Sequence, residues 1–254
     1  MVSSMTVWAR TLRTIFGRSE EVEQLRKRFA SRQSFLLHGP AGVGKTLLLS
    51  LVFPEFPQVL YSPQNPNPQS LSRNFSESLL AAGHSLLIEA CPRGVPSLQA
   101  KTAVSVKGLV RDALRNSKYL VIVDHLVRPS QSLAASVRAL MLDCSVQVIA
   151  VSRSDHMEDV GFVLPLFADR AEKFALRNFD SETAGMFAAW CAEREDLVAD
   201  NLVQFLQKIV RHSEGNPGAI VQMIRMAKRP QYSHGGLIKI TPLYIDYKIA
   251  MVNQ

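Results

Sequence analysis

The sequence predicts an α/β protein with a parallel sheet and helices on both of its faces, followed by a small helical domain. Three observations lead to this prediction. Short apolar runs typical of buried strands alternate with segments of helical periodicity along residues 1–178. One of these runs leads into a glycine-rich loop and then a helix. Over residues 179–230 the apolar residues recur at helical spacing instead.

The composition limits the class of protein. The chain has 254 residues, 47% of them hydrophobic, which is enough for one large domain with a small addition. With 20% charged residues it does not have the composition of a disordered chain. Its net charge of +7 is compatible with nucleic acid, anionic lipid or an acidic protein as partner, although the basic residues are scattered along the chain.

The cysteines and the apolar runs indicate a reducing, cytoplasmic environment. Cys91, Cys144 and Cys191 are far apart and form no CxxC pair, so neither a zinc site nor a disulfide framework is expected. The first 18 residues lack the long apolar core of a secretory signal. The longest apolar run next to a helix, residues 47–53, is too short to span a bilayer.

The strongest motif lies in SFLLHGPAGVGKTLLL, residues 34–49. An apolar run typical of a buried strand precedes the motif, and a leucine-rich segment typical of a helix follows it. The motif matches the phosphate-loop pattern G-x-x-x-x-G-K-[ST] and consists of Gly39, Pro40, Ala41, Gly42, Val43, Gly44, Lys45 and Thr46.

The residue types of this loop are those that bind the phosphates of a nucleoside triphosphate. Glycines let the backbone turn its N–H groups toward the phosphates, and the start of the helix adds its positive dipole end. Lys45 would place a positive charge on the β- and γ-phosphates, and the hydroxyl of Thr46 would be a magnesium ligand. The motif therefore predicts ATP and Mg²⁺ as cofactors.

The stretch YLVIVDHLV, residues 119–127, predicts a second part of the site. Its apolar run is typical of a central parallel strand that is buried on both faces. Asp124 stands at the carboxyl end of this strand, where we expect it to hold the magnesium ion through water. In most P-loop ATPases of this kind the next residue is a second acid that activates the attacking water, whereas this chain has His125.

The remaining core elements follow in order. An amphipathic helix capped by Ser19 is expected before the phosphate loop, with an apolar face on Val22, Leu25 and Phe29. Further strands are expected within residues 59–62, 145–155 and 172–179, and helices from residue 71, over 106–114 and over 132–142. Residues 84–104 show no clear pattern.

The predicted strands place three polar residues at one edge of the sheet. Ligands of parallel α/β sheets bind outside the carboxyl ends of the strands. Lys45, Asp124 and Arg153 all fall at or just after such ends.

The last third of the chain predicts a helical lid and a tail. Three helices are expected over residues 179–230, the first capped by Asp180 or Ser181 and the third beginning at Pro217. In the tail, residues 231–254, the alternation in LIKI and LYIDYKI favours a hairpin. The predicted domains are thus 1–178, 179–230 and 231–254.

A family resemblance is carried by the segments FGR-x-E-E-x-x-x-L, GPAGVGKT, YLVIVD, VSR and SEGNP. Through them the chain resembles AAA+ and STAND-type P-loop ATPases, with the archaeal-type and origin-recognition-like groups closest. The resemblance covers roughly residues 15–228. It implies that Phe16, Gly17 and Arg18 lie beside the adenine and ribose, and that Pro217 approaches the nucleotide.

The resemblance also implies roles for several arginines. Arg153 would be a sensor that reads the γ-phosphate, for which a guanidinium is well suited. Arg225 is a candidate second sensor. No classical arginine finger, which would act between subunits of an oligomer, can be assigned, and Arg170 is a possible one.

The expected function is a nucleotide-dependent switch in which Mg-ATP bridges core and lid. Turnover should be slow or partner-stimulated, since either His125 or a carboxylate from elsewhere, such as Asp155, would have to accept the proton. The partner is expected to be a protein.

Two alternatives stay open. One is an ATP-dependent DNA-handling protein, with LRKRF (25–29) and MAKRP (226–230) as basic segments. The other is a nucleotide-binding scaffold that no longer hydrolyses ATP.

Overall fold

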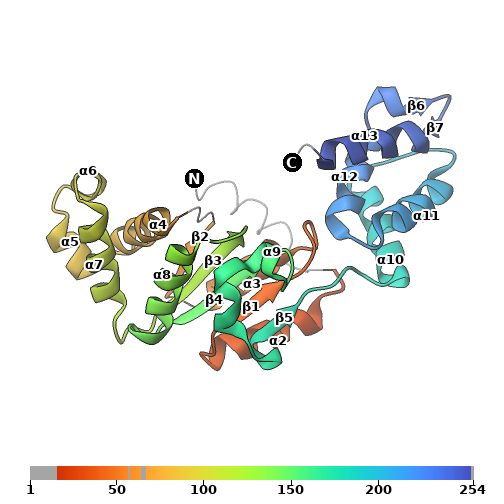
Figure 1. Ribbon diagram of the computed structural model, residues 1–254. Coiled ribbons are helices and arrows are strands. Elements are labelled where there is room, and N and C mark those ends of the chain that lie inside the picture. Colours follow the sequence, from red (N-terminus) through yellow and green to blue (C-terminus); the bar gives the residue numbers. More distant parts are fainter. Residues whose placement is uncertain (1–15, 57, 64–66, 253–254) are drawn as a thin grey trace. The chain divides into compact units, whose positions relative to one another are not determined.

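The structure, a computed structural model, describes residues 16–56, 58–63 and 67–252. These residues form two compact units (Figure 1). The first contains Glu20–Gly39 and Lys45–Leu176, and the second contains residues 16–19, Pro40–Gly44 and residues 177–252. Most of the N-terminal segment considered above for targeting lies outside the described residues.

The first unit is built on a five-stranded sheet with the strand order β2-β3-β4-β1-β5. All four strand pairs are parallel. The strands are β1 (Phe35–His38), β2 (Val59–Ser62), β3 (Leu120–Leu126), β4 (Gln147–Ser152) and β5 (Lys173–Ala175). Together with the helices that flank the sheet (Figure 1), this arrangement confirms the predicted α/β fold class.

The helices of this unit connect the strands, as parallel pairing requires. They include all the predicted ones, and residues 84–104 form two further short helices, α5 and α6, which pack on α4. The full set is α2 (Ser19–Ala30), α3 (Lys45–Val52), η1 (Phe53–Glu55), α4 (Pro68–Ala81), α5 (Ser85–Ala90), α6 (Val95–Gln99), α7 (Ala103–Leu114), α8 (Gln131–Leu142), α9 (Met157–Val160), η2 (Gly161–Phe167) and η3 (Arg170–Glu172).

The core of the first unit lies around β3 and β4. Val121, Ile122 and Val123 are fully buried, as expected for a strand in the interior of a parallel sheet. Helix α4 packs against β2 and α8 against β4. This packing fixes the carboxyl ends of β1, β3 and β4 side by side at one edge, because neighbouring strands are parallel and in register.

The second unit is mostly helical. Its core is formed by apolar side chains of four helices, among them Phe205, Ile220, Met223 and Leu243. Within the described residues of the whole chain, no helix has the length and apolarity needed to span a bilayer. The elements of this unit are α10 (Ser181–Arg194), α11 (Leu202–Ser213), α12 (Pro217–Ala227), η4 (Pro230–Tyr232), β6 (Ser233–His234), β7 (Leu237–Ile238) and α13 (Ile240–Val252).

The hairpin predicted between LIKI and LYIDYKI is wrong. Residues 243–249 lie in α13, and the small hairpin that does form pairs β6 with β7. Apolar residues occupy nine of the thirteen positions of α13, so that alternation and helical spacing are both present in the sequence. Tertiary packing decides for the helix, because Leu243 and Tyr247, four residues apart, are both buried in the lid core.

We expect the tail helix to contribute to the stability of the second unit. Leu243→Ala should lower its free energy of unfolding by about 2–5 kcal/mol, because the side chain is fully buried. Ile245→Ala, two residues away with 52% of the side chain exposed, should change it by less than about 0.5 kcal/mol. Denaturant unfolding followed by circular dichroism measures both, and equal losses would contradict the placement of α13.

Candidate nucleotide site

The phosphate loop has the predicted strand–loop–helix context. It connects β1 to α3, whose first residue is Lys45. The ammonium group of Lys45 donates a hydrogen bond to the carbonyl oxygen of Gly39 at 2.5 Å. Gly42 and Gly44 have φ angles of 78° and 102°, which side-chain-bearing residues rarely adopt. The loop backbone is therefore curved in a way that only glycines permit.

Lys45 lies in a position that favours an anion. Its pKa is lowered to about 8, mainly because burial removes the ammonium from water. The negative charge of Asp124 opposes this shift, and the positive charge of Arg153 adds to it. A phosphate group near Lys45 would compensate for the lost hydration, since an opposite charge stabilises the protonated form.

Asp124 is the most buried charged residue of the site, with only 2% of its surface exposed. Its Oδ2 atom accepts hydrogen bonds from the hydroxyl of Thr46 at 3.0 Å and from the hydroxyl of Tyr61 at 2.7 Å. Its Oδ1 atom accepts a hydrogen bond from the backbone N–H of His125 at 2.7 Å. The two residues predicted as metal ligands, Thr46 and Asp124, are therefore brought together.

Tyr61 is a site residue that the sequence analysis missed. It stands on β2, opposite Ile122 of β3 in the strand register. Burial, and next the negative charge of Asp124, raise the pKa of its hydroxyl, which keeps the group protonated as a donor. The sequence predicts the strand, but tyrosine is common in strands as a packing residue, so its contact with Asp124 could not be predicted.

His125 differs from a buried catalytic acid. Its backbone is left-handed, with φ at 53°, and it lies where the register of β3 and β4 shifts between Val123 and Leu126. The side chain is 59% exposed, and its Nδ1 atom lies 3.4 Å from Oδ1 of Asp124. The imidazole is thus a solvent-accessible neighbour of Asp124.

Asp155, the other candidate proton acceptor, is engaged in an ion pair. Lys173 donates a hydrogen bond to its Oδ2 atom at 3.1 Å, and this bond lowers the pKa of Asp155. On the other side, Nδ1 of His38 lies 3.8 Å from Oδ1. A carboxylate with a lowered pKa is a weaker base, so Asp155 is less suited than the sequence suggested to accept a proton.

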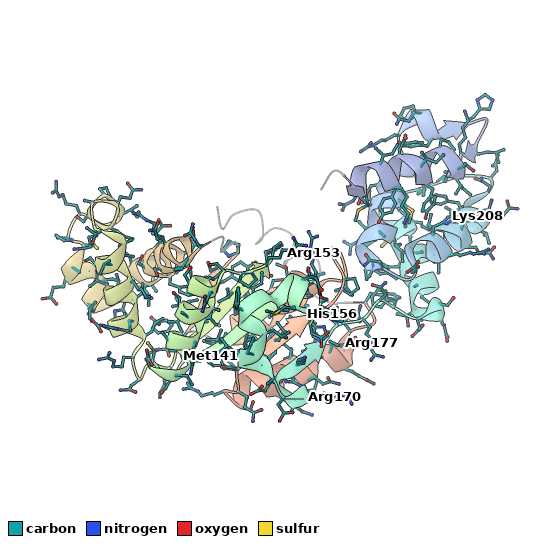
Figure 2. All side chains as sticks on the ribbon, in the orientation of Figure 1. Met141, Arg153, His156, Arg170, Arg177 and Lys208 are labelled. Atoms are coloured by element: carbon teal, nitrogen blue, oxygen red, sulfur yellow. The ribbon has the colours of Figure 1, made fainter. Side chains whose placement is uncertain are left out.

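The two arginine candidates of the first unit lie at different edges of the sheet. Arg153 is exposed and directly follows β4, at the same edge as Lys45 and Asp124. Arg170 lies in η3 before the amino end of β5, so that parallel topology places it at the opposite edge, as Figure 2 shows. Arg170 is therefore remote from the site of its own chain, and its role between subunits remains a prediction.

Phe16 and Gly17 lie in the second unit, where they pack on α10. The ring of Phe16 lies 5.7 Å from that of Phe187 and 6.0 Å from that of Trp190. A Cβ atom on Gly17 would come within 2.7 Å of Thr183, so this approach needs a glycine. Their predicted place beside the adenine remains a prediction.

Arg18 is buried, with 6% of its surface exposed. Its guanidinium donates a hydrogen bond to the carbonyl oxygen of Arg177 at 2.6 Å and lies 4.4 Å from the centre of the Phe179 ring. Within the second unit the arginine thus connects the segment before α2 to the segment before α10. Its predicted place beside the adenine and ribose remains a prediction.

The start of α12 is bound to the phosphate loop within the second unit. Asn216 caps the helix by accepting a hydrogen bond from the N–H of Ala219, and Pro217 is its first residue. The side-chain amide of Asn216 also donates to the carbonyl oxygen of Ala41 at 2.8 Å. In addition, the N–H of Gly218 donates to the carbonyl oxygen of Gly42 at 3.0 Å.

Asn216 and Gly218 were not predicted as site residues. The asparagine before a proline is a readable cap signal, but its second contact is made across 175 positions of sequence. Gly218 is required because a Cβ atom there would lie 2.8 Å from the Cα atom of Gly42. Neither contact can be predicted from the spacing of residues in a single sequence.

Arg225, the candidate second sensor, pairs within the lid. Its Nε atom donates to Glu195 at 2.9 Å, and Lys228 contacts the same carboxylate at 3.2 Å. Its predicted contact with a nucleotide remains a prediction.

The oxygen atoms of Thr46 and Asp124 fit magnesium. Mg²⁺ prefers oxygen ligands and is usually held by one or two carboxylates together with substrate phosphates, rather than by an all-protein cage. The part of the chain that the structure describes holds no group of three or more His, Cys, Asp or Glu side chains that could bind a metal ion.

The fold can be compared with known proteins. No protein-family model matches the chain, and no curated sequence is similar enough to show a relationship. Among solved structures, a Walker-type ATPase of Pyrococcus abyssi matches with a TM-score of 0.66 and 15% identity, over 94% of this chain and 74% of that one. The ORC2 protein of Aeropyrum pernix in its ADP form matches at 0.58 and 16%, over 92% and 69%. Cdc6p from Pyrobaculum aerophilum matches at 0.57 and 11%, over 85% and 62%.

The chain has the fold of a Walker-type ATPase. The predicted resemblance to the archaeal-type and origin-recognition-like ATPases is thus confirmed at the level of the fold. At these identities the likeness concerns the fold alone.

The contact between the phosphate loop and α12 can be tested with alanine. Gly218→Ala should lower the free energy of unfolding of the second unit by about 1–3 kcal/mol, because the new methyl group would meet the backbone of Gly42. It should also speed hydrogen exchange of the amide at position 218. Gly185→Ala in α10, where a methyl group meets nothing within 4 Å, is the control.

The control variant should be neutral or stabilising by up to about 1 kcal/mol, since alanine is the better helix former. Identical behaviour of the two variants would show that the loop and α12 do not approach as described.

Proposed function

We propose that this protein binds Mg-ATP at its phosphate loop and acts as a nucleotide-dependent switch, with hydrolysis that is slow or stimulated by a partner. The observation that carries the proposal is the placing of the Thr46 hydroxyl 3.0 Å from the buried Asp124 carboxylate, directly after Lys45 at the start of α3. This set combines a cation for phosphate with oxygen ligands for magnesium.

Each residue has a defined task in this proposal. Lys45 binds the β- and γ-phosphates, and Thr46 and Asp124 hold the metal ion, Asp124 through water. Arg153 contacts the γ-phosphate from the end of β4. Bound Mg²⁺ supplies charge neutralisation on the phosphate oxygens. The protein positions the phosphates and stabilises their charge, which is most of what phosphoryl transfer requires.

The surroundings of the proton acceptors favour slow turnover. His125 is exposed to solvent, so water competes with any ordered attacking water beside it. Asp155 is held by Lys173. An efficient general base has a pKa near the working pH and a fixed orientation toward the proton it accepts, and neither residue combines the two.

Switching would act through the phosphate loop. The backbone carbonyl oxygens of Ala41 and Gly42 accept hydrogen bonds from Asn216 and Gly218 at the start of α12. A change of the loop on nucleotide binding would therefore alter contacts of the lid directly. A protein partner that binds the lid would therefore respond to whether nucleotide is bound.

The basic segments named in the sequence do not favour the DNA-handling alternative. Arg26 makes a two-pronged contact with Glu55, and Lys228 pairs with Glu195. Arg28 lies over the rings of Phe35 and Phe174. These side chains thus have packing and ion-pair contacts within the chain, and salt-sensitive DNA binding remains the test of the DNA-handling alternative.

Nucleotide binding is the first test of the proposal. Lys45→Ala should weaken binding of a fluorescent ATP analogue in Mg²⁺ by about 10- to 100-fold, the value of a lost charge-assisted contact to phosphate. Lys27→Ala, which removes an exposed lysine of α2, should bind as the unaltered protein does. Equal affinity of both variants would contradict binding at the phosphate loop.

Single-turnover hydrolysis separates the switch from the scaffold. We expect a rate below about 1 s⁻¹, the lower end of ordinary enzyme turnover. If His125 accepts the proton, His125→Ala should lower this rate by about 100-fold or more, while Asp155→Asn should not. Fast turnover by the isolated protein would contradict the proposal, and binding without any phosphate release would identify the non-hydrolysing scaffold.

A further inference from the structure

The hydroxyl of Tyr61 lies closer to the carboxylate of Asp124 than the hydroxyl of Thr46 does. The Tyr61 hydroxyl donates to Oδ2 at 2.7 Å, and the same oxygen accepts from the Thr46 hydroxyl at 3.0 Å. The tyrosine thus bonds to the atom that also binds the other metal ligand. Neither the motif of the phosphate loop nor that of the Asp124 strand includes a residue of β2.

The surrounding fold fixes where this hydroxyl lies. The pairing of β2 with β3 places Tyr61 opposite Ile122, two residues before Asp124. The ring of Phe53 lies 5.6 Å from the ring of Tyr61. Phe53 begins η1, which directly continues α3, the helix that carries Thr46. The tyrosine is therefore held by the two elements that carry Asp124 and Thr46.

We propose that Tyr61 is a positioning residue that orients the Asp124 carboxylate for the magnesium-bound state. This inference rests on the proposed function, because it concerns the metal ion of that same site. Thr46 bonds to Oδ2 in this structure and would bind the metal when nucleotide is present. The Tyr61 hydroxyl also interacts with the hydroxyl of Thr46. Because Tyr61 is not itself a metal ligand in this proposal, its hydrogen bond to Oδ2 can hold that oxygen in place in both states.

The expected size of the effect follows from the way metal sites are supported. Carboxylates that bind metal ions are themselves hydrogen-bonded, and loss of such a supporting bond typically costs about 10- to 100-fold in metal affinity. Phenylalanine keeps the ring and its contact with Phe53 and removes only the hydroxyl. Tyr61→Phe should therefore act on metal binding while the packing of β2 stays the same.

The test measures Mg²⁺ dependence without hydrolysis. Fluorescent ATP analogue bound to the full chain is titrated with Mg²⁺, and Mn²⁺ binding to the same complex is followed by electron paramagnetic resonance. Tyr61→Phe should raise the half-saturating concentration of each metal by about 10-fold or more. Affinity for the analogue in EDTA should stay within about 2-fold, which also shows that the variant is folded.

Two further variants make the result specific. Tyr119→Phe removes another half-buried hydroxyl from the same unit, next to His84, and should leave the metal titration unchanged. In an Asp124→Asn background, Tyr61→Phe should add less than about 2-fold, because Tyr61 acts through the carboxylate. An independent effect in that background would show a general structural role and overturn the inference.

The outcomes also separate this inference from the proposed function. If the unaltered protein shows no metal-dependent nucleotide binding, the proposed function fails, and the inference fails with it. If the unaltered protein depends on the metal and Tyr61→Phe follows the same titration curve, the inference alone is overturned.

Discussion

The structure of the first unit is organised around one buried negative charge. Asp124 stands at the end of a central strand with 2% of its surface exposed, and a carboxylate removed from water is costly unless hydrogen bonds or cations compensate for the loss. Compensation comes from three elements, through the hydroxyls of Thr46 and Tyr61 and the backbone N–H of His125. The start of α3, the register of β2 and the irregular end of β3 therefore all meet at this carboxylate.

A second constraint acts on the phosphate loop. A Cβ atom at Gly218 would lie 2.8 Å from the Cα atom of Gly42, and a Cβ atom at Gly42 would lie 2.8 Å from Oδ1 of Asn216. The backbone hydrogen bond from Gly218 to Gly42 depends on this close approach. The loop that would bind phosphate is thus also part of the packing of the helical unit. Proteins that switch need an element whose arrangement both the ligand and the moving part can bias. The proposed switch would use the contacts of Asn216 and Gly218 with this loop.

The sequence predicted the elements whose signals are local. The phosphate loop, the strand before Asp124, the helix cap at Asp180 or Ser181 and the helix start at Pro217 could be predicted because a few neighbouring residues determine them. Tyr61, Asn216 and Gly218 could not, because their roles come from contacts between segments far apart in the chain. The tail was mistaken for a hairpin because apolar residues occupy nine of the thirteen positions of α13, so its period is ambiguous until Leu243 is seen to be buried. The second acid expected after Asp124 was correctly found to be missing, but only the structure shows that His125 is exposed there.

The central claim is that Thr46 and Asp124 form a magnesium site beside a phosphate-binding lysine. A crystal structure of the full chain grown with Mg²⁺ and a non-hydrolysable ATP analogue tests it most directly. We expect the triphosphate on residues 39–46, the metal ion bound to the Thr46 hydroxyl, and Asp124 still accepting the hydrogen bond of Tyr61. A nucleotide bound elsewhere, or a triphosphate on the loop with no metal ion near Thr46 and Asp124, would contradict it.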